Sequence, residues 1–348
     1  MTKQGRDFEL GGHSIAAGQR LTVEIPVSVM SDHTPVTMSV HVVNGKRPGP
    51  VLFVSAAIHG DEIIGVEIVR RLLRSKPLER LRGTLLAIPV VNAFGFLSRS
   101  RYLPDRRDLN RSFPGVAKGS LAARLAYIFI NEIVGKSDLG IDIHSAAIHR
   151  SNLPQIRISS GRPKAMEYAK AFGAPLILTS KVREGSLRAA AQEKGIDVLV
   201  FEGGEGLRFD EISVRTGVAG ILRVMHHMDM VSSRGVPRLR AKSIRSTSSS
   251  WVRAPVGGLF RSFRDIGEQV GKGEVLGAVS DPFGEIEIEI IAEEPGLLIG
   301  RANLPIVNEG DAVYHLAKIK EKHDAESTID TMASLLEEHP MFDEDEII

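Results

Sequence analysis

The stretch that decides the fold reads Val51-Leu-Phe-Val-Ser-Ala-Ala-Ile-His-Gly-Asp-Glu62. Its first eight residues form a nearly continuous apolar run, which is typical of a strand buried on both faces of a sheet. The polar end, His59 to Glu62, leads into a helical pattern over residues 63–73. A buried strand followed directly by a helix indicates a βα unit. Open α/β sheets bind their ligands at the carboxyl ends of such strands.

Similar units follow along the first 235 residues. Alternating segments at 21–26 and 36–43 predict half-exposed strands. The later expected elements are strands at 84–91, 139–144, 175–179 and 197–201 and helices at 121–134, 166–172 and 187–194. This alternation predicts an α/β fold with a mixed, mostly parallel sheet and helices on both faces. A long polar loop over 92–119 interrupts it, and loops of that length are usually functional or disordered.

The pattern changes near residue 235. Residues 236–250 are basic and rich in Ser, which predicts a linker. Residues 251–318 hold short apolar stretches separated by Gly, which predicts a small all-β barrel-sandwich domain. The expected division is therefore a catalytic domain over 1–235, a linker over 236–250, a β domain over 251–318 and an acidic C-terminal tail over 319–348.

Composition excludes several classes of partner. The net charge is +1, so we expect neither nucleic acid nor an anionic membrane surface as a partner. The chain has no cysteine, which rules out disulfides and thiolate metal sites. The first twelve residues lack the apolar segment of a signal peptide, and no apolar run approaches the length of a membrane span. We therefore expect a soluble, cytoplasmic protein that binds small molecules.

Three residues carry side chains that a divalent metal prefers. His59 and Glu62 stand three residues apart at a strand–helix junction, which places both on one face of the first turn. His144 ends the predicted strand 139–144 and should lie at the same edge of the sheet. Catalytic zinc takes three N or O ligands and keeps a fourth position open. The sequence predicts that these three side chains bind one zinc ion per chain. Asp142, two residues before His144, either orients that ligand or pairs elsewhere.

Glu202 and an Asn-Arg pair extend this hypothesis. Glu202 follows the very apolar strand 197–201, where a carboxylate is costly unless it has a task or a partner. A Glu beside zinc-activated water is the usual base in metal-assisted hydrolysis. Glu205, beyond two glycines, is the competing candidate and is expected to be exposed. Asn110-Arg111, in the basic loop, could hold a substrate carboxylate with two hydrogen bonds, although such a loop can also be merely solvated.

Four motifs then carry a resemblance to a known family. They are His59-Gly-Asp-Glu62, Asp108-Leu-Asn-Arg-Ser-Phe-Pro-Gly115, Ile141-Asp-Ile-His-Ser145 and Phe201-Glu-Gly-Gly204. In this order, over residues 50–205, they resemble the succinylglutamate desuccinylase and aspartoacylase family, which belongs with the zinc carboxypeptidases. The resemblance implies a zinc-carboxypeptidase-like fold, zinc as the cofactor on the three ligands above, and Glu202 as base and proton shuttle.

The resemblance also implies roles in substrate binding. Asn110 and Arg111 would bind a substrate carboxylate, with Asp108 in the same motif. Arg101 resembles the arginine that polarises the scissile carbonyl, and Arg106 is a possible substitute because the spacing to the next motif is longer here. Arg188 would line the substrate pocket.

The alternative interpretation of the segment around Arg188 is a helix start capped by Ser186. The family's second domain resembles a lipoyl-type barrel-sandwich, but the hairpin at 280–285 contains no Lys. A lipoyl or biotinyl attachment site is therefore not expected. The β domain is then a structural lid or an oligomerisation surface, which allows for a homo-oligomer.

We therefore expect a zinc-dependent amidohydrolase that cleaves the amide bond of a small N-acyl amino acid. In this mechanism zinc activates a water molecule and Glu202 accepts its proton. A metallocarboxypeptidase acting on short peptides would use the same metal and the same Asn-Arg pair. A non-catalytic binding protein on this fold is the alternative from another class, and it predicts that a ligand or the base is missing.

Overall fold

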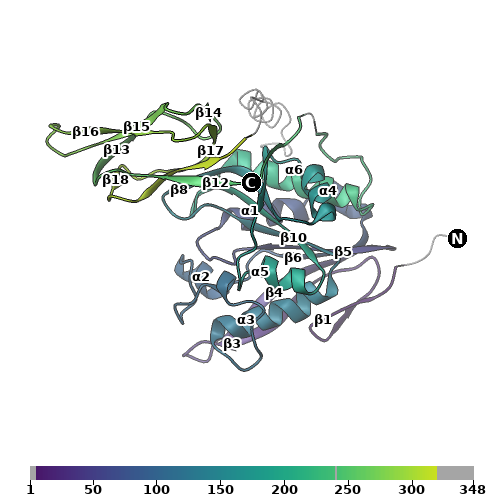
Figure 1. The fold of residues 1–348 in the computed structure, drawn as a ribbon. Helices are drawn as coiled ribbons and strands as arrows, with labels where there is room; N and C mark the ends of the chain where they lie inside the picture. The colour runs from purple at the N-terminus through teal and green to yellow at the C-terminus, as the bar shows by residue number, and fades with distance from the viewer. Residues whose placement is uncertain (1–4, 240, 320–348) are drawn as a thin grey trace, which may run out of the picture.

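A mixed β-sheet organises the computed structural model, which describes residues 5–239 and 241–319 (Figure 1). Its main path, in spatial order, is β12 (Ser249–Arg253), β19 (Ala312–Ala317), β17 (Gly296–Ala302), β8 (Arg150–Ser159), β10 (Asp197–Gly204), β7 (Leu139–His144), β5 (Arg47–Ala56), β6 (Arg82–Ile88), β4 (Pro35–Asn44) and β3 (Arg20–Val29). Beside this path lie β9 (Leu176–Ser180), β11 (Ile244–Ser246) and β14 (Gln269–Val270). A separate ribbon pairs β1 (Phe8–Leu10) with β2 (His13–Ile15).

The centre of the sheet is parallel. Strand β5 lies between β6 and β7, parallel to both, and β10 runs parallel to β7. Strands β4 and β8 join on either side of this centre in antiparallel orientation. The mixed α/β sheet predicted from the sequence is thus confirmed. The carboxyl ends of β5, β7 and β10 meet at one edge, as the predicted ligand site requires.

Helices cover both faces of the sheet (Figure 1). One core packs α1 (Ile64–Leu73), α4 (Pro163–Phe172) and α6 (Glu211–His227) against the sheet. The other core contains α3 (Leu121–Ile128), α5 (Leu187–Glu193) and the short helices η3 (Phe129–Ile133) and η4 (Val134–Lys136). The remaining helices are α2 (Ala93–Ser98), η1 (Lys76–Arg80) and η2 (Leu109–Arg111). In the part of the chain that the structure describes, no helix is long and apolar enough to cross a membrane.

Several elements are not predicted from the sequence, among them three helices. Helix α2 and η2 lie within the loop 92–119. Helix α6 is buried along most of its length, so it lacks a polar stripe, and its Gly217 and Gly220 argue against a helix. Those glycines lie against Ile68 and Phe172, so that α6 packs closely on α1 and α4.

Strand β8 is also unexpected, and it joins the two parts of the chain. One edge of β8 pairs with β10. Along the other edge, Arg150–Asn152 pair with β17 and Gln155–Ser159 pair with β9. Strand β11, within the expected linker 236–250, pairs in parallel with β9. This segment is therefore attached to the main sheet rather than being a free connection.

The C-terminal part is all-β, as predicted. Strands β16 (Glu287–Ile291), β15 (Val275–Ser280), β13 (Gly258–Ser262) and β18 (Ile306–Val307) form a four-stranded antiparallel sheet. It shares a core with β17 and β19, which continue the main sheet. The sequence does not predict this continuity. The domain boundaries at 235 and 250 stay predictions, and most of the acidic tail, from residue 320 on, lies outside the described residues.

The first prediction concerns the centre of the sheet. Gly140 of β7 lies opposite Phe53 of β5, and a Cβ atom on Gly140 would stand 2.1 Å from Phe53 Cζ. The Phe53 ring is held in place by an edge-to-face contact with Phe129, 5.7 Å between centroids. We expect Gly140→Ala to lower the free energy of unfolding by about 1–3 kcal/mol in urea titrations, because the core is overpacked.

Gly257→Ala is the matched control, since its added Cβ would approach no atom closer than 3.6 Å. We expect this control to stay within about 0.5 kcal/mol of the wild type. Equal stability of the two variants would contradict the packing described for Phe53.

Candidate metal and substrate site

Two tight backbone contacts place His59 and Glu62. After β5 the chain turns at Ala57, which has a φ of 51°. Gly60 then passes so close to α2 that a Cβ atom there would stand 1.8 Å from the carbonyl carbon of Gly95. The backbone N–H of Glu62 donates to the carbonyl of His59 at 3.1 Å. The chain therefore turns both side chains to the same side just before α1 begins.

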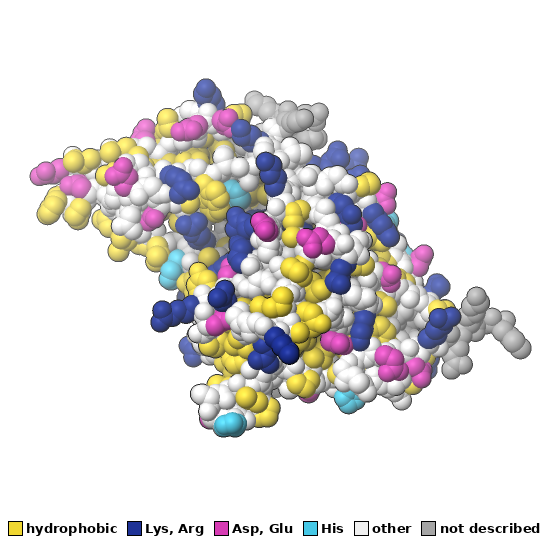
Figure 2. Space-filling view, turned by 60° about the horizontal axis from the view of Figure 1, so that its bottom comes forward, with side chains coloured by type: hydrophobic (Ala, Val, Ile, Leu, Met, Phe, Trp, Pro, Cys, Tyr) yellow, Lys and Arg dark blue, Asp and Glu magenta, His cyan; other side chains and the backbone are white. Residues whose placement is uncertain are grey.

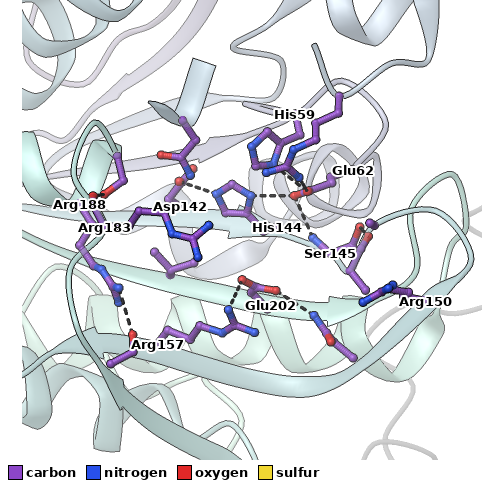
Figure 3. A pocket seen from close by; sticks show the side chains of 18 of the residues that line it. His59, Glu62, Asp142, His144, Ser145, Arg150, Arg157, Arg183, Arg188 and Glu202 are labelled. Atoms are coloured by element: carbon purple, nitrogen blue, oxygen red, sulfur yellow. Dashed lines mark hydrogen bonds and ion pairs between the residues drawn. The ribbon is translucent and has the colours of Figure 1, made fainter. Parts of the chain in front are cut away.

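Strands β7 and β10 bring the other two predicted residues to this edge. His144 is the last residue of β7, and Glu202 lies in β10. The two are register partners in the parallel pairing of these strands. Side chains of register partners point to the same face of a sheet. Figure 3 shows both of them directed into one pocket.

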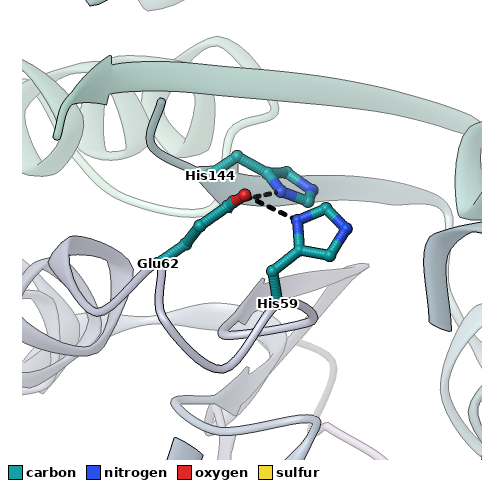
Figure 4. Close-up of side chains that lie close together, drawn as sticks. All are labelled: His59, Glu62 and His144. Atoms are coloured by element: carbon teal, nitrogen blue, oxygen red, sulfur yellow. Dashed lines mark hydrogen bonds and ion pairs between the residues drawn. The ribbon is translucent and has the colours of Figure 1, made fainter. Parts of the chain in front are cut away.

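The three predicted metal ligands meet around the carboxylate of Glu62 (Figure 4). Glu62 Oε1 lies 2.7 Å from His59 Nδ1, and its Oε2 lies 2.7 Å from His144 Nδ1. One ligand atom from each residue falls within 4.8 Å of the others, and all three residues are buried. The sequence prediction that these side chains lie together is therefore confirmed.

The far nitrogen of each imidazole contacts a second carboxylate. His59 Nε2 lies 3.1 Å from Asp108 Oδ1, and His144 Nε2 lies 2.8 Å from Asp142 Oδ2. Asp142 also accepts a hydrogen bond from Ser55. Asp142 therefore contacts His144, the predicted ligand, and is also paired with Ser55. Each imidazole therefore has its Nε2 beside an outer carboxylate and its Nδ1 directed toward Glu62. Imidazoles that bind metals usually have one nitrogen on the metal and the other on such a carboxylate.

Charge in this cluster is balanced by the carboxylates. Burial alone would lower the pKa of His144, but Asp142 and Glu62 outweigh it and raise that pKa well above its usual value. Burial alone would also lower the pKa of His59, but Glu62 and Asp108 raise it. Burial would raise the pKa of Glu62, but the two imidazoles lower it instead. The cluster therefore strongly favours an ionised Glu62.

This donor set fits a divalent ion of the zinc type. It offers two imidazole nitrogens and one carboxylate, which leaves a position open on a four-coordinate ion. The outer carboxylates Asp108 and Asp142 fix the imidazole orientations and increase the basicity of the rings. The geometry thus supplies both the ligands and the residues that orient them.

Glu202 has two partners that the sequence does not predict. Its Oε1 lies 3.1 Å from Arg157 Nη1, and its Oε2 accepts a hydrogen bond from Asn152 Nδ2 at 2.8 Å. Both partners come from β8. The apolar neighbours of Arg157, Ile156 and Ile158, were a signal for a strand at this place. Nothing in the sequence indicates that this strand lies beside β10.

The long loop 92–119 places Arg101 beside the metal cluster. Arg101 Nη1 lies 3.1 Å from Glu62 Oε1, and its Nη2 lies 3.0 Å from Asp108 Oδ2. Arg106, the possible substitute, is exposed and does not line the cavity. Asp108, expected among the substrate-binding residues, contacts His59 and Arg101, and its role toward a substrate stays a prediction.

Asn110, Arg111 and Arg188 line the same cavity. Asn110 Oδ1 accepts a hydrogen bond from the backbone N–H of Leu187 at 2.9 Å, which ties the long loop to the start of α5. Ser186 caps that helix by accepting from the N–H of Ala189, and Arg188 still reaches the cavity. Ser186 therefore caps the helix, and Arg188, two residues later, lines the cavity.

The competing carboxylate Glu205 has a structural task. It accepts hydrogen bonds from the backbone of His149 and from Asn303 in the C-terminal part. Its side chain is 20% exposed, so it is more enclosed than the sequence predicts. Glu205 does not line the cavity.

Positive charge dominates the cavity, which has a volume of about 410 Å³. Its basic residues are Arg101, Arg111, Arg150, Arg157, Lys181, Arg183, Arg188 and Arg301. Its acidic residues are Glu62, Asp142 and Glu202. The C-terminal part contributes Trp251 and Arg301. Figure 2 shows basic side chains gathered around the notch between that part and the rest of the molecule.

Comparisons with known proteins agree with this geometry. The family model described as the succinylglutamate desuccinylase/aspartoacylase catalytic domain matches residues 48–228, just over half of the chain. The chain is 26% identical over 329 residues to the N-alpha-acetyl-L-2,4-diaminobutyric acid deacetylase of Halomonas elongata. That match covers 90% of this chain and 94% of the relative.

Solved structures show the same fold. A succinylglutamate desuccinylase/aspartoacylase from Rhodobacter sphaeroides is similar with a TM-score of 0.77 and 26% identity, covering 87% of this chain and 96% of that one. The product-bound ectoine utilization protein EutE (DoeB) from Ruegeria pomeroyi is similar with a TM-score of 0.76 and 25% identity. That match covers 86% of this chain and 94% of the other.

The second prediction tests how His144 is oriented. Asp142→Asn keeps the shape of the side chain but removes the charge beside His144 Nε2. We expect the affinity for zinc to fall about 10- to 100-fold, measured by competition with a chromogenic chelator. Asp32→Asn, in the exposed turn between β3 and β4, removes the same charge elsewhere and should bind zinc like the wild type. Unchanged affinity in Asp142→Asn would show that Asp142 does not act on His144.

Proposed function

The chain belongs to the succinylglutamate desuccinylase/aspartoacylase family, and from this premise we propose that it is a zinc-dependent deacylase of small, anionic N-acyl amino acids. The observation that carries the proposal is the buried cluster of His59, Glu62 and His144, with Glu202 beside it in the next strand. All four side chains line one cavity of a size suited to a small molecule.

The chemistry follows from the positions of these side chains. When bound, a zinc ion supplies Lewis acidity toward the scissile carbonyl and the attacking water. A carboxylate oxygen of Glu202 takes the proton from that water and returns it to the departing amine. Arg101 stabilises the developing negative charge on the carbonyl oxygen. Its Nη1 and Nη2 each carry a second hydrogen beyond those used for Glu62 and Asp108.

The charge of the cavity supports an anionic substrate. Eight basic side chains line it, against three acidic ones. Of these, Glu62 belongs to the metal cluster and Asp142 contacts His144. The deacetylase of Halomonas elongata is named for a diaminobutyric acid derivative, whose side-chain amine is cationic. Such an amine would be repelled in this cavity. Arg111 and Asn110 hold the carboxylate of the amino-acid portion, and Arg188 lines the pocket beyond them.

The non-catalytic alternative predicts a missing ligand or base. Within the described residues the three ligands and Glu202 are all present and share one cavity. The metallocarboxypeptidase alternative would use the same residues, so an experiment has to distinguish it from the deacylase.

The third prediction tests the function directly. With zinc present, the enzyme should release free amine from N-acyl amino acids with acidic groups faster than from dipeptides, measured by amine detection across a panel. Glu202→Gln should lower kcat by about 10²- to 10⁴-fold, because the base is lost. The same variant should retain bound zinc, since Glu202 is not a ligand. Faster cleavage of dipeptides would instead support the carboxypeptidase alternative.

The fourth prediction separates Arg101 from Arg106. We expect Arg101→Gln to lower kcat by about 10²- to 10³-fold, as for the loss of a donor to a developing oxyanion. Arg106→Gln removes the same charge from an exposed site outside the cavity and should leave kcat unchanged. A loss of activity in Arg106→Gln with normal activity in Arg101→Gln would reverse the assignment.

A further inference from the structure

The segment 204–207, at the end of β10, is tied to both segments that carry the metal ligands. The backbone N–H of Ala146, the second residue after β7, donates to the carbonyl of Gly204 at 3.2 Å. The N–H of Leu207 donates to the carbonyl of Asp61 at 2.8 Å, in the turn that carries the other two ligands. Any movement of this segment is therefore felt on both sides of the metal cluster.

Glu205 ties the same segment to the C-terminal part. Its Oε1 accepts a hydrogen bond from the backbone N–H of His149 at 2.9 Å, and its Oε2 accepts one from Asn303 Nδ2 at 2.9 Å. Asn303, directly after β17, also donates from Nδ2 to Ser151 Oγ at 2.7 Å and from its backbone N–H to the carbonyl of His149 at 2.8 Å. We call these four residues the clasp. Glu205 and Asn303 do not line the cavity, so they do not contact a substrate held there.

The clasp lies beside an irregularity in the strand that carries the base. Glu202 is the register partner of Gln155, and Gly204 is the register partner of Asn152. Strand β10 therefore advances two residues where β8 advances three, which is a β-bulge. Pro154 lies within it, as is usual for a proline inside a strand. Bulges bend a strand and change the direction of its side chains, and they are common next to active sites.

Asn152 connects the clasp to the base. Its Nδ2 donates to Glu202 Oε2 at 2.8 Å. It follows Ser151 of the clasp, and it pairs with Gly300 of β17. A Cβ atom on Gly300 would stand 3.0 Å from Asn152 Oδ1, so this side chain lies directly against the C-terminal part. A shift of β17 would therefore move the donor that holds Glu202.

From these contacts we propose that Glu205 is a positioning residue for the deacylase reaction. Together with Asn303 it fixes the bulge, and the fixed bulge aims the carboxylate of Glu202 at the metal cluster. The C-terminal part then contributes to catalysis by holding the base, in addition to any role as a lid or an oligomerisation surface. This inference rests on the function proposed above, because it takes Glu202 as the base.

The charge and the position of Glu205 suit this role. Hydrogen bonds to an ionised carboxylate are roughly twice as strong as those between neutral groups. The Glu205 side chain is 20% exposed, so water competes with its partners only in part. Gly204, directly before it, has a φ of 71°, a conformation in which glycine leaves the backbone free to move. The segment after the base therefore depends on Glu205 to keep it in place.

The fifth prediction reverses the direction of a hydrogen bond in the clasp. Glu205→Gln supplies one acceptor where two donors point, and Asn303→Asp places a second carboxylate opposite Glu205. Each single change should lower kcat about 10- to 100-fold, because the base is misplaced. KM and the affinity for zinc should stay within about twofold, since neither residue touches the substrate or the metal.

The double variant provides the rescue. With Glu205→Gln and Asn303→Asp together, the new amide donates to the new carboxylate, which can still accept from Ser151. We expect kcat to return to within about threefold of the wild type, because changes at residues in contact are not additive. Glu293→Gln removes an exposed carboxylate of the C-terminal part outside the cavity and should keep the wild-type kcat. Wild-type kcat in both single variants would overturn the proposal.

Trp251 shows whether the C-terminal part stays in place. It is the only tryptophan of the chain, and its ring stacks on His315 with 4.1 Å between centroids. Arg150 of β8 lies over the same ring, 5.3 Å from its centroid. Fluorescence of Trp251 should keep its emission maximum in both single variants. A shifted maximum together with a low kcat in the double variant would mean that the changes only detach the C-terminal part, and the positioning role would be refuted.

Hydrogen exchange of residues 203–207 gives a readout that needs no turnover. Their backbone amides should exchange at least about tenfold faster in each single variant and at the wild-type rate in the double variant. If exchange responds in this way but the wild type cleaves no N-acyl amino acid, the function proposed above is wrong and the clasp remains. If the wild type is active and exchange changes while kcat does not, the positioning role is refuted and the deacylase function stands. Unchanged exchange would refute the clasp itself.

Discussion

A carboxylate closed off from water between two imidazole rings is the constraint on which this structure depends. Glu62 is almost fully buried, and an ionised carboxylate in that position is stable only beside matching partners. His59 supplies one from the turn after β5, and His144 supplies the other from the end of β7. The turn after β5, the close passage of Gly60 by α2 and the end of β7 all have to fit together for this contact to form. Asp108 and Asp142 then complete the balance of charge.

The parts of the fold that follow local rules could be predicted from the sequence. The apolar runs ending at His59, His144 and Glu202 identify buried strands, and parallel strands bring their carboxyl ends to one edge. Strand β8 could not be placed in this way, because antiparallel insertion beside β10 depends on contacts distant in sequence. For the same reason Arg157 and Asn152, which hold Glu202, were not foreseen.

The net charge of the chain does not indicate the charge of the cavity. The chain carries 44 basic and 43 acidic residues, which suggests no preference for charged partners. Folding separates these charges, so that one cavity collects eight basic side chains and exposes few acidic ones. A cavity with low-dielectric walls strengthens the field of such a cluster. Net charge therefore describes the surface as a whole, whereas selection among small substrates depends on the side chains that the fold brings together.

The shared edge of β8 has a consequence for how the molecule can be divided. The first three residues of that edge are covered by β17 from the C-terminal part, and the last five by β9 from the catalytic part. A fragment ending before β17 would leave the beginning of β8 as an open strand edge, with backbone donors and acceptors available to other chains. Such a fragment would be prone to aggregation and would lose the support of the strand that carries Asn152 and Arg157. The two parts should accordingly unfold as one cooperative unit rather than as separable modules.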